Sequence, residues 1–140
     1  MYVDTAIFMY ALGSESPYRE PCARILSAGA TGSVVLTTSA ETLQEILHRY
    51  HSIGRDEDIR LAFDAVAASV RRILPVTGDD LQEARRLGDR IKDRRVSARD
   101  LLHAAVARRH GLGQVLTTDK GFAGIPGIAP VDPLRWSPAG

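Results

Sequence analysis

Met1-Tyr2-Val3-Asp4-Thr5-Ala6 is a short apolar run that meets an acid and passes directly into a helical pattern. We expect a strand over Met1–Asp4 and a helix over Thr5–Leu12. Asp119 stands in the same position behind a later apolar run, Gln114–Thr118. Both acids therefore fall at the carboxyl ends of expected strands, where ligands collect in parallel α/β sheets.

Short β-like runs alternate with longer helical patterns along the whole chain. Such alternation implies parallel strand pairing and a layered α/β fold. We expect one domain over residues 1–132 and a short, loose tail over residues 133–140. The further expected strands are Ser33–Thr37, Leu74–Val76 and Ile128–Val131, and the further expected helices are Cys22–Ala28, Ser39–His51, Asp56–Arg72, Leu81–Lys92 and Ser97–His110.

The composition is that of an ordinary globular chain, with 44% apolar residues among 140. No apolar run approaches the roughly 20 residues that span a bilayer, and the N-terminus lacks the basic region of a signal peptide. The single cysteine, Cys22, cannot form an internal disulfide, which fits a reducing compartment. We therefore expect a cytoplasmic protein with no membrane segment.

Four carboxylates occupy positions suited to an oxygen-ligand metal site. Asp4 and Asp119 end strands, and Glu45 and Asp100 lie near the starts of helical stretches. Hard cations such as Mg²⁺ take oxygen ligands, whereas acids brought together without a cation repel one another. Each acid also has a plainer role, as a helix cap or as a solvated side chain, and Ser97-x-x-Asp100 resembles a capping box. If the fold brings the four together, they indicate a metal site.

Basic residues gather between Arg85 and Arg109, where nine of them stand against three acids, although the net charge of the chain is only +1. The plain interpretation is a solvated helix face with ion pairs one turn apart. Beside an acidic metal cluster, the segment is better interpreted as a track for a nucleic-acid backbone, since Arg forms paired contacts with phosphate. These residues are Arg85, Arg86, Arg90, Lys92, Arg94, Arg95, Arg99, Arg108 and Arg109.

Four motifs, in this order, resemble those of the PIN-domain ribonucleases, and within them the VapC toxins of bacterial and archaeal toxin–antitoxin pairs. The resemblance covers essentially the whole chain. The opening Asp-Thr and the closing Thr-x-Asp-x-x-Phe are fairly specific, whereas the motif around the Glu is looser. The motifs are Val3-Asp4-Thr5-Ala6, Thr38-Ser39-Ala40-Glu41-Thr42-Leu43-Gln44-Glu45-Ile46-Leu47, Arg99-Asp100-Leu101-Leu102-His103-Ala104-Ala105-Val106-Ala107 and Leu116-Thr117-Thr118-Asp119-Lys120-Gly121-Phe122.

The resemblance implies a PIN-like three-layer sandwich, with helices on both faces of a mainly parallel sheet. It also implies a catalytic acid set in which Asp4, Asp100 and Asp119 bind Mg²⁺ or Mn²⁺ and Glu45 binds the metal or orients water. Glu41, one turn before Glu45, is the rival for the second position. Hydroxyl groups beside the acids would hold phosphate or metal-bound water, and these belong to Thr5, Thr117 and Thr118.

The implied activity is metal-dependent hydrolysis of RNA by the toxin of a type II toxin–antitoxin pair. The implied partners are the RNA substrate, a cognate VapB-type antitoxin and a second copy of the chain. The helices that carry Ile25, Leu26, Leu61 and Phe63 are candidates for the dimer face.

Two other classes of protein remain as alternatives. A non-catalytic PIN-like module that binds RNA or protein would be expected to lose one or more of the four acids. A receiver-like signalling domain needs a phospho-acceptor Asp after a mid-chain strand, whereas Ser33–Thr37 is followed by Thr38 and Ser39. His103, one turn after Asp100, is interpreted as a packing or hydrogen-bonding residue rather than a catalytic one.

Overall fold

The chain forms a five-stranded parallel sheet in the computed structural model, which describes residues 1–93 and 95–138. The strand order is β3-β2-β1-β4-β5, and each of the four pairings is parallel. β1 therefore lies at the centre, with β2 on one side and β4 on the other. The strands are β1 (Tyr2–Val3), β2 (Thr37–Ser39), β3 (Arg72–Leu74), β4 (Gln114–Leu116) and β5 (Ala129–Val131).

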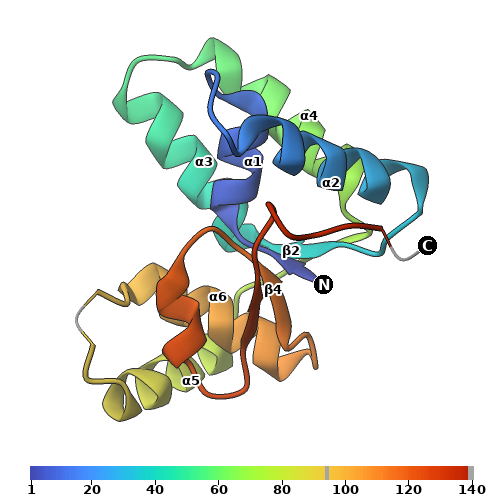
Figure 1. Cartoon of the computed structure of the whole chain (residues 1–140). Helices are drawn as coiled ribbons and strands as arrows, with labels where there is room; N and C mark the ends of the chain where they lie inside the picture. The colour runs from blue at the N-terminus through green and yellow to red at the C-terminus, as the bar shows by residue number, and fades with distance from the viewer. Residues whose placement is uncertain (94, 139–140) are drawn as a thin grey trace.

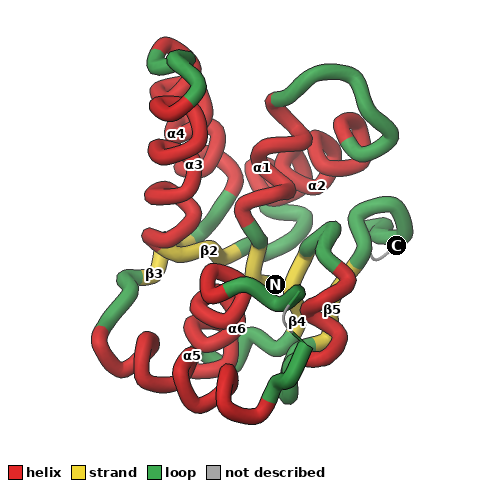
Figure 2. Tube along the Cα trace, turned by 90° about the vertical axis from the view of Figure 1, so that its left-hand side faces the viewer, coloured by secondary structure: helices red, strands yellow, loops and turns green. Residues whose placement is uncertain are grey.

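Helices cover both faces of this sheet, as the three-layer expectation requires. Figures 1 and 2 show α1 to α4 on one side of the strands and α5 and α6 on the other. Across the described residues, no helix has the length and apolar character needed to cross a membrane. The helices are α1 (Thr5–Leu12), α2 (Arg19–Thr31), α3 (Ala40–Ser52), α4 (Glu57–Ser69), α5 (Gly78–Arg90), α6 (Ala98–Arg109) and the short 3₁₀ helix η1 (Lys120–Gly124).

Successive side chains of the central strands β1 and β4 point to opposite faces of the sheet, and the core is accordingly divided into two clusters. Tyr2 and Val115 are buried among residues of α5, α6 and η1, whereas Val3 and Leu116 are buried among residues of α1 to α4. Successive side chains of a strand point to opposite faces, so a strand of two residues serves both layers. All four side chains are fully buried. This explains why a run as short as Met1–Asp4 can be the centre of the sheet.

The second expected helix and strand are displaced from their predicted positions. α2 continues through Gly29 because this glycine allows close packing. A Cβ at Gly29 would lie 2.3 Å from the backbone oxygen of Ser69. The helix ends instead at Gly32, whose φ of +83° is the left-handed conformation typical of helix ends. The expected strand Ser33–Thr37 is correspondingly replaced by β2, which begins at Thr37 opposite Tyr2.

The buried face of α3 is rotated relative to the sequence pattern. The spacing of Leu43, Ile46, Leu47 and Tyr50 predicts one inward stripe, but Leu47 is 48% exposed. Ile46 and Tyr50 are buried as expected, and Thr42 is buried with them. The rotation turns Glu45 toward α6, where it meets a buried polar group described below.

A buried carboxylate fastens α5 to α6 on the other face. Thr77 and Asp80 form a reciprocal capping box at the start of α5, and Arg109 Nη1 donates to Asp80 Oδ1 at 2.7 Å. Burial opposes ionisation of Asp80, but the hydrogen bonds from Thr77 and Arg109 outweigh it and lower the pKa of this carboxyl. Helix capping and interhelical packing thus depend on one charged side chain.

Asp80→Asn should lower the free energy of unfolding by about 2 kcal/mol at pH 7, the usual scale for a charged hydrogen-bonded pair. The pKa of Asp80 is lower in the folded than in the unfolded chain, so its stabilisation is complete above about pH 4 and fades as the pH falls further. Urea denaturation of both proteins over this pH range measures the difference. Asp79→Asn is the matched control, because that side chain is 83% exposed. An equal loss in both variants would contradict the assignment.

Candidate active site at the carboxyl edge of the sheet

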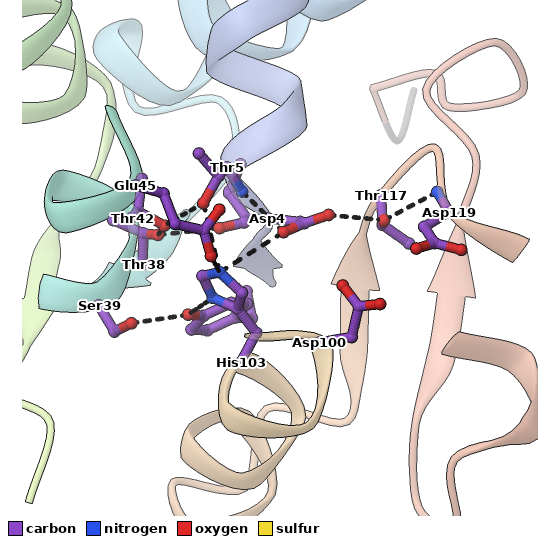
Figure 3. Close-up of polar contacts among 12 residues, drawn as sticks. Asp4, Thr5, Thr38, Ser39, Thr42, Glu45, Asp100, His103, Thr117 and Asp119 are labelled. Carbon is purple, nitrogen blue, oxygen red and sulfur yellow. Dashed lines mark hydrogen bonds and ion pairs between the residues drawn. The ribbon is translucent and has the colours of Figure 1, made fainter. Parts of the chain in front are cut away.

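A cavity of about 930 Å³ opens where the strand order reverses, beside the carboxyl ends of β1 and β4. All four predicted acids, Asp4, Glu45, Asp100 and Asp119, line it. They come from the end of β1, from α3, from the first turn of α6 and from the segment after β4. Figure 3 shows Asp4, Asp100 and Asp119 around one space. The fold therefore brings together residues that are up to 115 positions apart in sequence.

Asp4 is the most enclosed of the four acids, with 6% of its surface exposed. Its Oδ1 accepts the backbone N–H of Thr5 at 2.8 Å, and its Oδ2 accepts the hydroxyl of Thr117 at 2.9 Å. Burial raises the pKa of Asp4, although His103 and Thr117 act in the opposite direction. Asp4 thus caps α1 and presents a fixed carboxylate to the cavity.

Asp100 and Asp119 form the opposite side of this acidic group. Asp100 Oδ2 accepts the backbone N–H of Ser97 at 3.1 Å, which confirms the predicted capping box. Asp119 accepts the backbone N–H of Gly121 at 2.8 Å and is exposed. Burial and the charges of Asp119 and Asp4 raise the pKa of Asp100 to about 6, although the backbone of Ser97 favours ionisation. The acids are close enough to repel one another.

Glu45 lies inside the cavity, whereas Glu41 is not among its lining residues. Glu45 Oε1 is 2.9 Å from His103 Nε2. Burial alone would raise the pKa of Glu45, but the contact with His103 outweighs burial and the net shift is downward. For Glu41, burial and the charge of Glu45 raise the pKa instead. The two glutamates therefore stand in different electrostatic environments.

The structure confirms the hydrogen-bonding role expected for His103, whereas the sequence did not indicate which residues it contacts. Its ring is 1% exposed, and each nitrogen has a partner. Nδ1 is 2.5 Å from the Tyr2 hydroxyl, which in turn is 2.8 Å from Ser39 Oγ. Burial lowers the pKa of His103, but the hydrogen bond to Glu45 and the charge of Asp4 raise it more. The available signal was its position three residues after Asp100, on the same side of α6.

The predicted hydroxyl residues take up different positions. Thr117 bridges two acids, because its hydroxyl donates to Asp4 and accepts the backbone N–H of Asp119 at 3.0 Å. Thr5 Oγ1 lies 3.2 Å from His103 Nε2 and donates to Thr42 at 3.3 Å. Thr118 is half-buried and lines the cavity. Ser39 stands at the N-cap of α3, but its hydroxyl is directed to Tyr2 rather than to the backbone of this helix.

The basic segment divides into two groups, which corrects its interpretation as one continuous track. Arg95 and Arg99 line the cavity. Arg85 pairs with Asp89 and Arg86 with Glu83, so these cations belong to the exposed face of α5. Arg108 and Arg109 likewise pair with acids of α5, and Arg94 lies outside the described residues. On the far wall of the cavity, two further cations come from the end of α3 and the turn after it, Arg49 and Arg55.

Comparison with known proteins decides the family. The PIN-domain family model matches residues 1–128. The chain belongs to the PIN-domain family. VapC ribonuclease Mb1869c of Mycobacterium bovis and ribonuclease VapC13 of Mycobacterium tuberculosis are each 40% identical to it over 126 residues, which cover 90% of this chain and 95% of the relative. Ribonuclease VapC23 of Mycobacterium tuberculosis is 37% identical over 123 residues, covering 88% and 95%.

Solved structures of VapC-type proteins share the architecture of this PIN domain. VapC20 of Mycobacterium tuberculosis, described as a sarcin-ricin loop cleaving toxin, matches with a TM-score of 0.70 at 21% identity, covering 92% of this chain and 98% of that one. VapBC2 of Rickettsia felis, solved on a DNA fragment from its promoter, matches with a TM-score of 0.72 at 17% identity, covering 93% and 96%. At these identities the likeness supports the fold.

The donor chemistry of this PIN domain suits a hard divalent cation. Asp4, Asp100 and Asp119 supply carboxylate oxygens. Burial and, after it, the charges of Asp119 and Asp4 raise the pKa of Asp100, and a cation would relieve the repulsion between these charges. Among the described residues, no group of three or more His, Cys, Asp or Glu side chains is already arranged to hold a metal ion. Mg²⁺ usually keeps several waters, so carboxylates can hold it through water without closing on it directly.

Asp119→Asn should lower the pKa of Asp100 from about 6 toward the ordinary aspartate value, because it removes one of the charges that raise it. A carboxyl-carbon NMR titration of the metal-free protein measures this pKa. Asp64→Asn, on the exposed side of α4, is the matched control and should leave the pKa in place. An unchanged titration of Asp100 in the Asp119 variant would show that the two carboxylates do not interact.

Proposed function

We propose that this chain is a metal-dependent endoribonuclease and the toxin of a type II toxin–antitoxin pair. One observation carries the proposal: four acids from four separate segments line one cavity at the carboxyl edge of the sheet, in a chain 40% identical to VapC ribonucleases. The reaction is hydrolysis of a phosphodiester bond in RNA. A non-catalytic PIN-like module is less favoured, because none of the four acids is missing.

The roles of the acids follow from their positions. Asp4, Asp100 and Asp119 would hold Mg²⁺ or Mn²⁺. When bound, such a cation lowers the pKa of a water, orients it and neutralises charge on the phosphate. Glu45 lies beside Asp4 and would bind the cation or orient the attacking water. Thr117 holds the Asp4 carboxylate in place through its hydroxyl.

Cations at the cavity mouth would bind the RNA backbone on both sides of the acids. Arg95 and Arg99 lie on the α6 side, and Arg49 and Arg55 lie on the α3 side. Arg95 pairs with Asp93, and Arg55 with Asp58. Neither Arg49 nor Arg99 forms an ion pair with any carboxylate in residues 1–93 and 95–138. These two guanidinium groups are therefore the most available for phosphate.

The proposed partners are a VapB-type antitoxin and a second copy of the chain. VapBC2 of Rickettsia felis was solved as an assembly on promoter DNA, which supports an antitoxin partner. An Arg of the antitoxin placed against the acids would inhibit the site by bidentate pairing. Ile25 and Leu26 are buried in the core of this chain, whereas Leu61 on α4 is 61% exposed, which supports α4 as a contributor to the dimer face. The cytoplasm is the compartment that we infer for such a pair.

Asp4→Asn should reduce metal-dependent RNA cleavage at least about a hundredfold, because several kcal/mol of charge stabilisation would be lost. The amide oxygen can still accept the N–H of Thr5, but the amide nitrogen cannot accept the hydroxyl of Thr117, so the fold should remain intact with a lower melting temperature. Cleavage of total RNA with Mg²⁺ or Mn²⁺, followed by mapping of the new 5′ ends, measures the activity. Asp64→Asn serves as the control. RNA binding without cleavage by the wild-type chain would favour the non-catalytic module.

Arg99→Ala should weaken RNA binding and reduce the slope of log affinity against log salt by about 0.7 to 1, as expected for one lost phosphate contact. Binding is measured by fluorescence anisotropy in metal-free buffer, so that the RNA stays intact. Arg85→Ala is the matched control, because Arg85 pairs with Asp89 outside the cavity. Equal slopes for the wild-type chain and the Arg99 variant would remove Arg99 from the RNA contact.

A further inference from the structure

His103 is a buried polar side chain whose contacts all lead to the acidic site or to the strand ends beneath it. Its Nε2 is 2.9 Å from Glu45 Oε1, 3.2 Å from Thr5 Oγ1 and 3.7 Å from Asp4 Oδ1. Its Nδ1 is held by the hydroxyl of Tyr2. Figure 3 shows the ring of His103 directly below the carboxylate of Glu45, with Asp4 beside them. The ring thus links α6, α3 and β1 at one point.

The neighbours of Nε2 determine where the proton lies. Two carboxylates can only accept, and the Thr5 hydroxyl donates to Thr42, so Nε2 must carry the hydrogen. The other nitrogen can accept from the Tyr2 hydroxyl or donate to it, because Ser39 can take either complementary role. Nε2–H therefore donates to Glu45 Oε1, and the Tyr2–Ser39 pair fixes the plane of the ring.

We propose that His103 is a positioning residue that holds the Glu45 carboxylate in the acidic site and thereby selects Glu45 over Glu41 as its second acid. This role rests on the proposed metal-dependent function. A glutamate side chain has several rotatable bonds. The Nε2–H of His103, whose ring is held at Nδ1 by Tyr2, binds the Glu45 carboxylate and removes this rotational freedom before the cation binds. Glu41 has no such bond to the ring in the described structure and lies outside the cavity lining.

The first experiment measures Mn²⁺ binding without RNA, by electron paramagnetic resonance of the free ion. His103→Leu should weaken binding about tenfold, as is usual for residues that orient metal-binding groups. Glu45→Gln should weaken it too, and His103→Leu should add little in the Glu45→Gln background, because the histidine acts through that carboxylate. His103→Gln, which keeps an N–H donor, should restore part of the affinity. His110→Leu, the same change near the end of the same helix, is the control.

The second experiment observes the hydrogen bond itself by proton NMR of the metal-free protein. His103 is the one buried histidine of the four, so its ring N–H should exchange slowly enough to appear as a downfield resonance. Glu45→Gln should shift or abolish this resonance, and Glu41→Gln should leave it in place. Tyr2→Phe keeps the packing of β1 but removes the hydroxyl, so it should broaden the resonance and weaken Mn²⁺ binding about two- to fivefold.

The outcomes separate this role from the proposed function. A wild-type chain that binds no Mn²⁺ and cleaves no RNA would overturn the function, and with it the role of His103. If the wild-type chain does both and His103→Leu binds Mn²⁺ equally well, only the positioning role fails. An equal loss of Mn²⁺ affinity from His103→Leu in the wild-type chain and in the Glu45→Gln variant would also overturn the positioning role. The same holds if His103→Gln restores no affinity, or if the ring N–H resonance is unchanged in the Glu45→Gln variant.

Discussion

Asp4 places a carboxylate at the end of the central strand, where 6% of its surface reaches solvent. Burying a charge of this kind is costly unless other groups replace its water. Two hydrogen-bond donors do so here, the N–H of Thr5 at the start of α1 and the hydroxyl of Thr117 after β4, and Nε2 of His103 from α6 lies 3.7 Å from the carboxylate. Each comes from a different element, so the position of one carboxylate constrains how β1, β4 and α6 come together.

The same constraint explains why the site lies at the point where strand order reverses. β1 pairs with β2 on one side and with β4 on the other. The segment after β2 continues into α3 on one face of the sheet, whereas the segment after β4 continues into η1 on the other face. A crevice forms at the carboxyl ends of such strands. Asp4 and Thr117 meet across it directly, at 2.9 Å. The buried hydroxyl–carboxylate bond therefore closes the floor of the cavity between the two strands.

The sequence predicts a site residue when a local sequence pattern determines its position, and fails to predict its role when that role arises only from tertiary packing. Asp4 and Asp119 follow from strand ends, whereas Asp100 and Glu45 follow from the resemblance of their motifs to those of the PIN-domain ribonucleases. The three-layer parallel fold follows from the alternation of strands and helices. The contacts of Tyr2 and His103 do not follow, because they exist only where β1, α3 and α6 meet. The early end expected for α2 was wrong for the same kind of reason, since Gly29 serves a contact with Ser69 and not a helix stop.

The arginines also divide into two groups, those that pair with acids within the α5–α6 layer and those that line the cavity. Arg85, Arg86 and Arg109 pair with acids on their own helix or its neighbour, so they stabilise the α5–α6 layer. Arg49 and Arg99 stand at the mouth of a cavity with acids on its floor. A polyanion approaching this surface meets cations first, yet the acids beneath would repel its phosphate. A divalent cation bound there as proposed would reverse this repulsion, so metal binding and RNA binding would then favour each other through electrostatics.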